Sequence, residues 1–210
     1  MQLVEDENYP NPNYIVFTGE GKTELNVMKG LAHVYNGRDI ILHFPLSTLS
    51  RRTGLTALKS IKTTSKYYNS MIYIVDGDVF DNIPINEIQD YLKGIGIKIN
   101  DVKLIREAFL INCEKGDKVI NLYCIISGQT FIEEEIACLI KLKWGIDIDI
   151  TGIRDIPWKK RIKREVNQVL KEKNIRIESL IKETGKKKLE IAFPNFCAVL
   201  KKIEEDYSKN

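Results

Sequence analysis

The chain is poor in the residues that build zinc sites. Its 210 residues include only two histidines, His33 and His43, which stand apart in the sequence. The four cysteines form no CxxC pair, so their spacing does not predict a metal-thiolate site. The sequence also shows no secretory signal. We therefore expect reduced thiols and a cytoplasmic protein.

Long apolar runs and an excess of one charge are also missing. No apolar run approaches the roughly 18 residues that a membrane span requires, so we expect no membrane partner. Lysine and arginine total 32 against 29 acidic residues, which gives a net charge of +3. That balance neither requires nor excludes nucleic acid, and the distribution of the charges matters more. Hydrophobic residues make up 43% of the chain, enough for a real core.

Strand-like and helix-like patterns alternate over most of residues 14–144. We expect strands at 14–18, 39–44 and 71–75, and a hairpin within 102–126 whose two runs flank a turn at 114–117. We expect helices at 22–34, 52–68, 85–92 and 131–144. The alternation predicts an α/β fold, Rossmann-like, with a largely parallel central sheet flanked by helices.

Composition divides the chain into three parts. Residues 1–13 are polar and carry two prolines, and we expect a flexible arm there. Residues 14–145 hold the predicted α/β domain. Residues 146–210 are basic and mainly helical in pattern, with candidate helices at 158–173 and around 194–207, and form a predicted C-terminal extension.

The turn after the first predicted strand permits two interpretations. The sequence Gly21-Lys22-Thr23 would end a phosphate-binding loop, and MIYIVD (71–76) resembles the strand that carries a magnesium aspartate in P-loop NTPases. However, Val16 stands where the first loop glycine belongs. Glu20 would also face the phosphate and repel it. A small P-loop NTPase is therefore the weaker alternative.

A metal site fits the same residues better. Glu20 ends the first strand, and Asp76 and Asp78 follow the apolar run 71–75. Sites in parallel sheets form at the carboxyl ends of strands, so these three carboxylates can converge there. If the chain stays extended, Asp76 and Asp78 point the same way. Carboxylate oxygens are the ligands that Mg²⁺ or Mn²⁺ prefers.

The motifs FTGEGKTE (17–24) and IVDGDVFD (74–81) resemble those of the TOPRIM domain. This family occurs in topoisomerases, bacterial primases, small rRNA-maturing ribonucleases and the overcoming-lysogenization-defect (OLD) nucleases. The Gly-Lys-Thr-Glu continuation looks most like the OLD type. The resemblance covers residues 14 to about 144. It implies a TOPRIM fold, a catalytic or metal-binding Glu20, and Asp76 and Asp78 as ligands of Mg²⁺ for phosphodiester chemistry.

The chain lacks features of the larger TOPRIM proteins, and this narrows the activities that we expect of it. The chain has no room for the further domains that carry the topoisomerase tyrosine, and its cysteines do not supply a primase zinc module. The ATPase of OLD nucleases is also missing, so a separate partner chain would have to provide one. What remains is a stand-alone TOPRIM protein.

Three further residues are candidates for the site. The resemblance to OLD-like members points to an acidic residue at the start of a later helix, where Glu133 and Glu134 stand. Thr130 and Glu133 also match a capping box, which would give Glu133 a purely structural role. Lys22 follows the catalytic turn and is placed to touch a scissile phosphate or, equally, to lie in solvent.

The segment 158–173 is the predicted nucleic-acid contact. Its basic and aromatic candidates for binding are Trp158, Lys159, Lys160, Arg161, Lys163 and Arg164. The lysines and arginines would contact phosphates, and the indole would stack on a base. The alternative is a solvated helix face.

Together these patterns predict a Mg²⁺- or Mn²⁺-dependent nuclease, or a related phosphodiester-transfer enzyme, acting on DNA or RNA. The alternative from another class is a non-catalytic nucleic-acid-binding or adaptor protein that keeps the fold.

Overall fold

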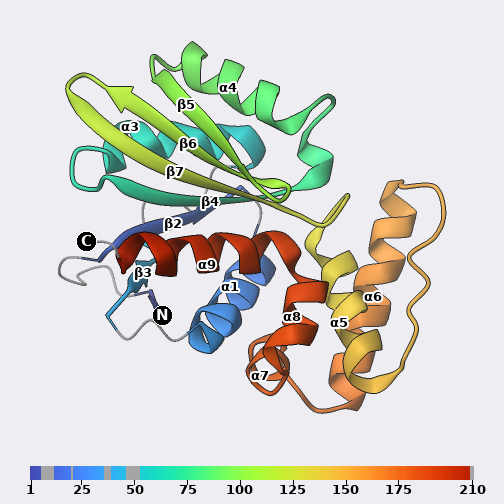
Figure 1. The fold of residues 1–210 in the computed structure, drawn as a ribbon. Helices are drawn as coiled ribbons and strands as arrows, with labels where there is room; N and C mark the ends of the chain where they lie inside the picture. Colours follow the sequence, from blue (N-terminus) through green and yellow to red (C-terminus); the bar gives the residue numbers. More distant parts are fainter. Residues whose placement is uncertain (6–11, 20, 36–38, 46–52, 209–210) are drawn as a thin grey trace.

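A computed structural model describes residues 1–5, 12–19, 21–35, 39–45 and 53–208. Its centre is a seven-stranded sheet in the order β1-β3-β2-β4-β7-β6-β5 (Figure 1). The strands are β1 (Gln2–Val4), β2 (Tyr14–Thr18), β3 (Ile41–His43), β4 (Ser70–Asp76), β5 (Lys98–Ile105), β6 (Ala108–Lys115) and β7 (Lys118–Ser127). The first five strands of this order, β1, β3, β2, β4 and β7, are parallel to their neighbours, whereas β7, β6 and β5 pair antiparallel. The predicted α/β fold with a largely parallel sheet is confirmed, whereas the TOPRIM type stays a prediction.

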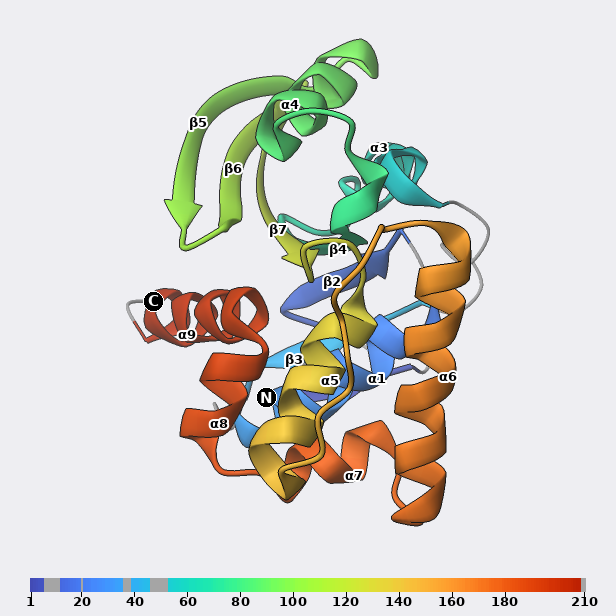
Figure 2. The ribbon, with the colours of Figure 1, turned by 90° about the vertical axis from the view of Figure 1, so that its right-hand side faces the viewer.

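Helices cover both faces of the sheet (Figures 1 and 2). They are α1 (Lys22–Val34), the 3-10 helix η1 (Gly54–Ser60), α3 (Ile61–Thr64), the 3-10 turn η2 (Gly77–Val79), α4 (Pro84–Gly94), α5 (Ile132–Trp144), α6 (Ile156–Glu172), α7 (Ile177–Lys182), α8 (Lys186–Ala192) and α9 (Pro194–Tyr207). Helices α3 and α4 lie on one face, and α1, α5 and α9 lie on the other. None of the described helices combines the length and the apolar character that a membrane span needs.

Alternation along the central strands builds the two halves of the core. Ile15 and Phe17 of β2 belong to the cluster beneath α3 and α4, whereas Val16 belongs to the cluster around α1 and α5. Successive side chains of a strand point to opposite faces, so a fully apolar strand is buried on both. The runs at 14–17 and 71–75 are apolar at every position because both faces of each strand are covered.

Strand order creates a switch point at the centre of the sheet. The chain leaves β2 through α1 to reach β3 on one side, then returns through η1 and α3 to β4 on the other side. Open α/β sheets bind ligands where the direction of the crossovers reverses, outside the carboxyl ends of the strands. Thr18 and Asp76 are the last residues of the two strands at that point.

Two expectations about the elements need correction, and a third is incomplete. Gln2–Val4 forms a strand paired with β3, so this part of residues 1–13 is not a loose arm; a three-residue strand is too short to show a periodicity. The hairpin predicted within 102–126 is confirmed, because β6 and β7 pair antiparallel around the turn at 116–117. However, the run at 104–112 reverses direction at Arg106, whose φ is +57°, so β5 joins the hairpin in a three-stranded meander that the sequence did not predict. Of the helix predicted at 52–68, residues 54–60 are 3-10 and only 61–64 are α-helical.

The C-terminal segment packs onto the sheet. Its helices α6, α7, α8 and α9 contribute to the same hydrophobic cluster as α1 and α5. Helix α9 crosses the meander, where the hydroxyl of Tyr123 on β7 donates to Oδ2 of Asp206 at 2.8 Å. The helical character predicted for this segment is confirmed.

Candidate active site

A pocket of about 350 Å³ opens where the start of α1, the end of β4, the start of α5 and one face of α6 meet. Figure 2 shows α5 and α6 side by side beyond the ends of β2 and β4. The residues that line the pocket are Gly21, Lys22, Thr23, Glu24, Asp76, Phe131, Glu133, Lys159, Lys160 and Lys163. The pocket therefore lies at the switch point and combines carboxylates with lysines.

Asp76 is the buried acid at the end of β4. Its side chain is 8% exposed, and its Oδ1 accepts hydrogen bonds from the hydroxyl of Ser127 at 2.6 Å and from the backbone N–H of Ile132 at 3.1 Å. Ser127 ends β7 and stands beside Asp76 in the parallel register. The neighbouring strand and the first turn of α5 thus fix the orientation of this carboxylate.

Asp78 does not point with Asp76 as an extended chain would require. The 3-10 turn η2 begins at Gly77, and the N–H of Asp78 donates to the carbonyl of Thr130 at 2.9 Å. The carboxylate of Asp78 is half-exposed, forms an ion pair with Lys159, and does not line the pocket. The expectation of two parallel aspartates is wrong in this respect, because the chain turns between them.

The predicted capping box assigned the cap to Glu133, but in the structure Glu134 is the capping residue. The helix begins at Ile132, one residue later than a Thr130 cap requires, and Glu134 occupies its third position. Oε2 of Glu134 accepts from the N–H groups of Thr130 at 2.7 Å and Phe131 at 3.3 Å. Glu134 therefore caps the helix. Glu133, which is 5% exposed, lines the pocket and pairs with Lys163 at 3.3 Å.

Glu24 is a pocket acid that sequence analysis missed. It is buried in the first turn of α1, where its Oε2 accepts from the N–H of Gly21 at 2.9 Å. Burial raises the pKa of Glu24, the hydrogen bonds from the backbone oppose this, and the nearby Glu133 raises it further while Lys163 lowers it. A glutamate at the third position of a helix usually indicates only a cap, so its place in the pocket gave no signal in the sequence.

Glu20, the predicted catalytic glutamate, lies outside the described residues. The residues on either side of it are placed: the N–H of Gly19 donates to the carbonyl of Ile74 on β4 at 2.8 Å, and Gly21 lines the pocket. Gly19 and Gly21 are thus both placed near the end of β4. Lys22, predicted to reach a phosphate, lines the pocket from the start of α1.

Helix α6 turns three of its predicted binding residues toward the pocket, namely Lys159, Lys160 and Lys163. Its buried face carries Trp158, Ile162, Val166 and Leu170 at helical spacing. Arg161 instead pairs with Glu165, and Arg164 is exposed. The helical period therefore places Lys159, Lys160 and Lys163 at the pocket and leaves Arg161 and Arg164 outside it.

Trp158 is a core residue, so the stacking role predicted for it is wrong. Its side chain is 5% exposed, its indole N–H donates to the carbonyl of Thr151 at 3.1 Å, and its ring meets that of Phe131 edge-on at 5.3 Å. An indole enclosed in this way offers no face to a base. It anchors α6 against α5 instead.

The pocket contains carboxylates, the type of ligand that hard divalent cations take, together with four lysines. The candidate ligands Asp76 and Glu133 present carboxylate oxygens, and buried carboxylates require a positive charge nearby. Among the described residues, no three histidine, cysteine or acidic side chains group closely enough to hold a metal ion. The third carboxylate that the sequence predicts, Glu20, is outside that set.

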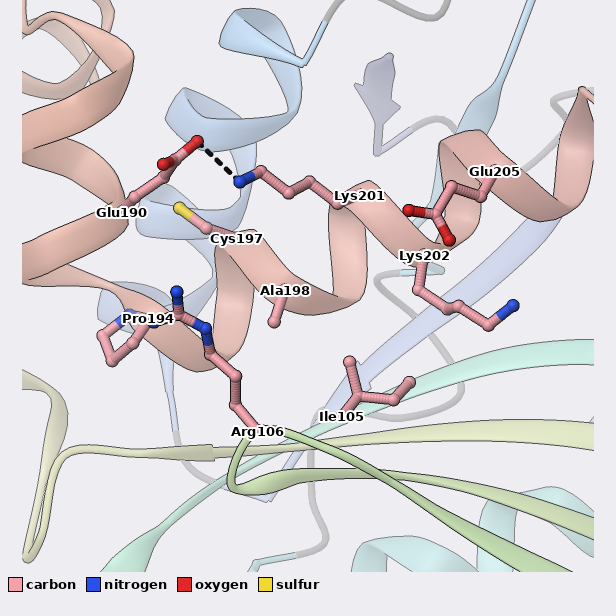
Figure 3. A pocket seen from close by; sticks show the side chains of 9 residues that line it. All are labelled: Ile105, Arg106, Glu190, Pro194, Cys197, Ala198, Lys201, Lys202 and Glu205. Carbon is pink, nitrogen blue, oxygen red and sulfur yellow. Dashed lines mark ion pairs between the residues drawn. The ribbon is translucent and has the colours of Figure 1, made fainter.

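A second hollow lies between the turn at Arg106 and helices α8 and α9 (Figure 3). It has a volume of about 200 Å³, and its charges are largely paired: Lys201 meets Glu190 at 2.9 Å, and Lys202 pairs with Asp206. Burial raises the pKa of the Cys197 thiol in its wall to about 11, so that thiol is protonated at neutral pH. None of the predicted site residues lies there.

The comparisons with known proteins add no relative. No protein-family model, no curated protein and no solved structure matches this chain.

Proposed function

We propose that this chain is a divalent-metal-dependent nuclease, or a related phosphodiester-transfer enzyme of TOPRIM type, that acts on DNA or RNA. One observation carries the proposal: a single pocket at the switch point of the sheet is lined by the carboxylates of Asp76 and Glu133 and by the ammonium groups of Lys22 and Lys160. The first kind of group binds hard cations and the second binds phosphate.

The residues divide the work of phosphodiester cleavage. Asp76, held by Ser127, and Glu133 would bind Mg²⁺ or Mn²⁺, with Glu20 as a shared ligand or as the base that accepts a proton from water. The cation would neutralise the phosphodiester, lower the pKa of the attacking water and stabilise the leaving oxygen. Lys22 and Lys160 would bind the non-bridging oxygens and hold the phosphate in place.

The hydrogen bonding at the start of α1 supports a metal site over a nucleotide cradle. In a P-loop the N–H groups of the glycine-rich turn point at phosphate oxygens. Here the N–H of Gly21 donates to the carboxylate of Glu24, which occupies that position with negative charge. This contact favours the nuclease proposal over the small P-loop NTPase. An adaptor that binds nucleic acid without cutting it remains the alternative that the experiment below tests.

A cleavage assay tests the proposal. Plasmid DNA and a structured RNA are each incubated with the full chain in Mg²⁺ or Mn²⁺ and again with EDTA. We expect metal-dependent cutting that Asp76→Asn reduces by about a hundredfold or more. Asp90→Asn removes an exposed acid on α4 that pairs with Lys93, and should cut normally.

Two results would count against a nuclease. Cutting that persists unchanged in Asp76→Asn would show that the activity comes from elsewhere. Binding of either nucleic acid without any metal-dependent cutting would favour the adaptor.

A further inference from the structure

Two ion pairs join helix α6 to the acids of the candidate site. Lys159 pairs with Asp78, and Lys163 pairs with Glu133 at 3.3 Å. The two lysines are four residues apart and so lie on the same face of α6, one turn apart. Both line the pocket that Asp76 and Glu133 share. The basic helix therefore supplies positive charge to Glu133, which the proposed function assigns to a metal, and to Asp78, which follows the proposed ligand Asp76 by two residues.

We propose that Lys159 and Lys163 are exchangeable counter-ions of this site, so that a divalent cation and nucleic acid bind to it cooperatively. The inference rests on the proposed function and adds how its two ligands are coupled. In the absence of ligands the lysines neutralise Asp78 and Glu133. Phosphates that draw the lysines away leave those carboxylates to the cation, and a cation that takes the carboxylates leaves the lysines to phosphate.

In the pair of Glu133 and Lys163, the carboxylate is buried and must stay neutralised, whereas the lysine can leave. The side chain of Glu133 is 7% exposed, and a carboxylate in that setting is costly without a positive charge nearby. The side chain of Lys163 is 61% exposed, so it can leave for a phosphate at little cost in solvation. Departure of the lysine and arrival of the cation are therefore linked through the acid that both neutralise.

In the pair of Lys159 and Asp78, the lysine lines the same pocket and the aspartate lies outside its lining. Lys159 also lies 5.4 Å from the centre of the Phe131 ring, which keeps its chain against the pocket wall. A phosphodiester, like the half-exposed carboxylate of Asp78, carries one negative charge shared by two oxygens, so it can replace that carboxylate as the partner of the Lys159 ammonium. Coupling of this kind is reciprocal: each ligand must tighten the binding of the other by the same factor.

The inference is tested by titrating Mn²⁺ into the full chain without nucleic acid and measuring the heat of binding by calorimetry. Removing the competing lysines in a Lys159→Met/Lys163→Met variant should tighten Mn²⁺ binding by about fivefold or more. Lys163→Gln alone, which keeps a polar group beside Glu133, should tighten it less. Lys171→Met removes an exposed lysine near the end of the same helix and should leave the affinity unchanged.

Anisotropy of a labelled oligonucleotide gives the reciprocal measurement. DNA and RNA strands with cleavage-resistant backbones are titrated with the chain in the presence and absence of Mn²⁺. Mn²⁺ should tighten binding to the wild-type chain, and this gain should disappear in the double variant.

The outcomes separate the two proposals. If the wild-type chain binds and uses Mn²⁺ but the lysine variants bind it no more tightly, the counter-ion exchange is wrong and the nuclease stands. If neither the wild-type chain nor any variant binds Mn²⁺, the proposed function fails and the exchange fails with it.

Discussion

The hydroxyl of Ser127 donates a 2.6 Å hydrogen bond to Oδ1 of Asp76, between the last residues of two neighbouring parallel strands. Ser127 is fully buried, so the bond is protected from water. The carboxylate at the centre of the candidate site is therefore held by the sheet itself.

Replacing Ser127 by alanine should weaken the site without dismantling the fold. A partner that orients a metal-binding carboxylate is worth about tenfold to a hundredfold in metal affinity, whereas a lost buried hydrogen bond costs about 1 kcal/mol of stability. Calorimetric titration of Mn²⁺ and urea unfolding measure the two effects. Ser179→Ala, at an exposed position of α7, is the matched control. Equal Mn²⁺ affinity in the two variants would show that Ser127 does not position a ligand.

Gly77 allows the turn after β4 to pack against the loop before α5. A Cβ at this position would lie 2.4 Å from the carbonyl oxygen of Gln129, which belongs to the backbone and cannot move aside easily. Gly77→Ala should therefore destabilise the fold by about 1–3 kcal/mol in chemical denaturation. Gly94→Ala, at the end of α4 with nothing within 4 Å, should be neutral or slightly stabilising. Equal stability of the two variants would contradict this packing.

Glu135 should make the stability of the chain depend on pH. It is buried on α5, and its Oε2 has no hydrogen-bond partner among the described residues. Burial raises its pKa well above the ordinary 4.5, the N–H of Gly128 opposes the rise, and the acids Asp76, Glu134 and Glu107 add to it.

The folded state therefore keeps the Glu135 proton at pH values where the unfolded state has lost it. Its contribution to stability is fully present below pH 4.5 and is lost as the pH rises toward the folded-state pKa. Glu135→Gln, which is always neutral, should gain stability over the wild type at pH 8 relative to pH 4. Urea unfolding at both values measures the gain, and an equal difference at both would contradict a raised pKa.

The cysteines should resist alkylation in the folded chain. Burial raises the pKa of Cys113 to about 12 and that of Cys197 to about 11, and Cys124 is shifted in the same direction. Only thiolates react readily, so we expect slow modification by iodoacetamide at pH 8. Cys138, which is half-buried, should react first. Mass spectrometry in buffer and in urea checks this order, and rapid native labelling of Cys124 would contradict it.

The sequence predicted the elements whose pattern is strong and local. The apolar runs that became β2 and β4 and the periodic segments that became α1, α5 and α9 are placed within a few residues. It missed the reversal at Arg106, because that turn contains no glycine, proline or asparagine to mark it. A positive φ at an arginine depends on the surrounding packing, which composition does not reveal.

At the site, several residues that the sequence singled out line one pocket, but the sequence did not reveal their partners. It singled out Asp76, Glu133 and the lysines of α6, and the structure brings these to one pocket. The helical spacing of Trp158, Ile162, Val166 and Leu170 marks the buried face of α6, but which acids its neighbouring lysines meet depends on the tertiary contact of α6 with α5. A one-residue shift in the start of α5 likewise exchanged the roles of Glu133 and Glu134, because adjacent helical residues point about 100° apart.

Binding of Mn²⁺ to the wild-type chain and to Asp76→Asn tests the central claim most directly. We predict saturable binding to the wild type that Asp76→Asn weakens by about tenfold or more while Asp90→Asn leaves it unchanged. A wild-type chain that takes up no Mn²⁺, or an Asp76→Asn variant that binds it as tightly as the wild type, would contradict a metal site at the end of β4.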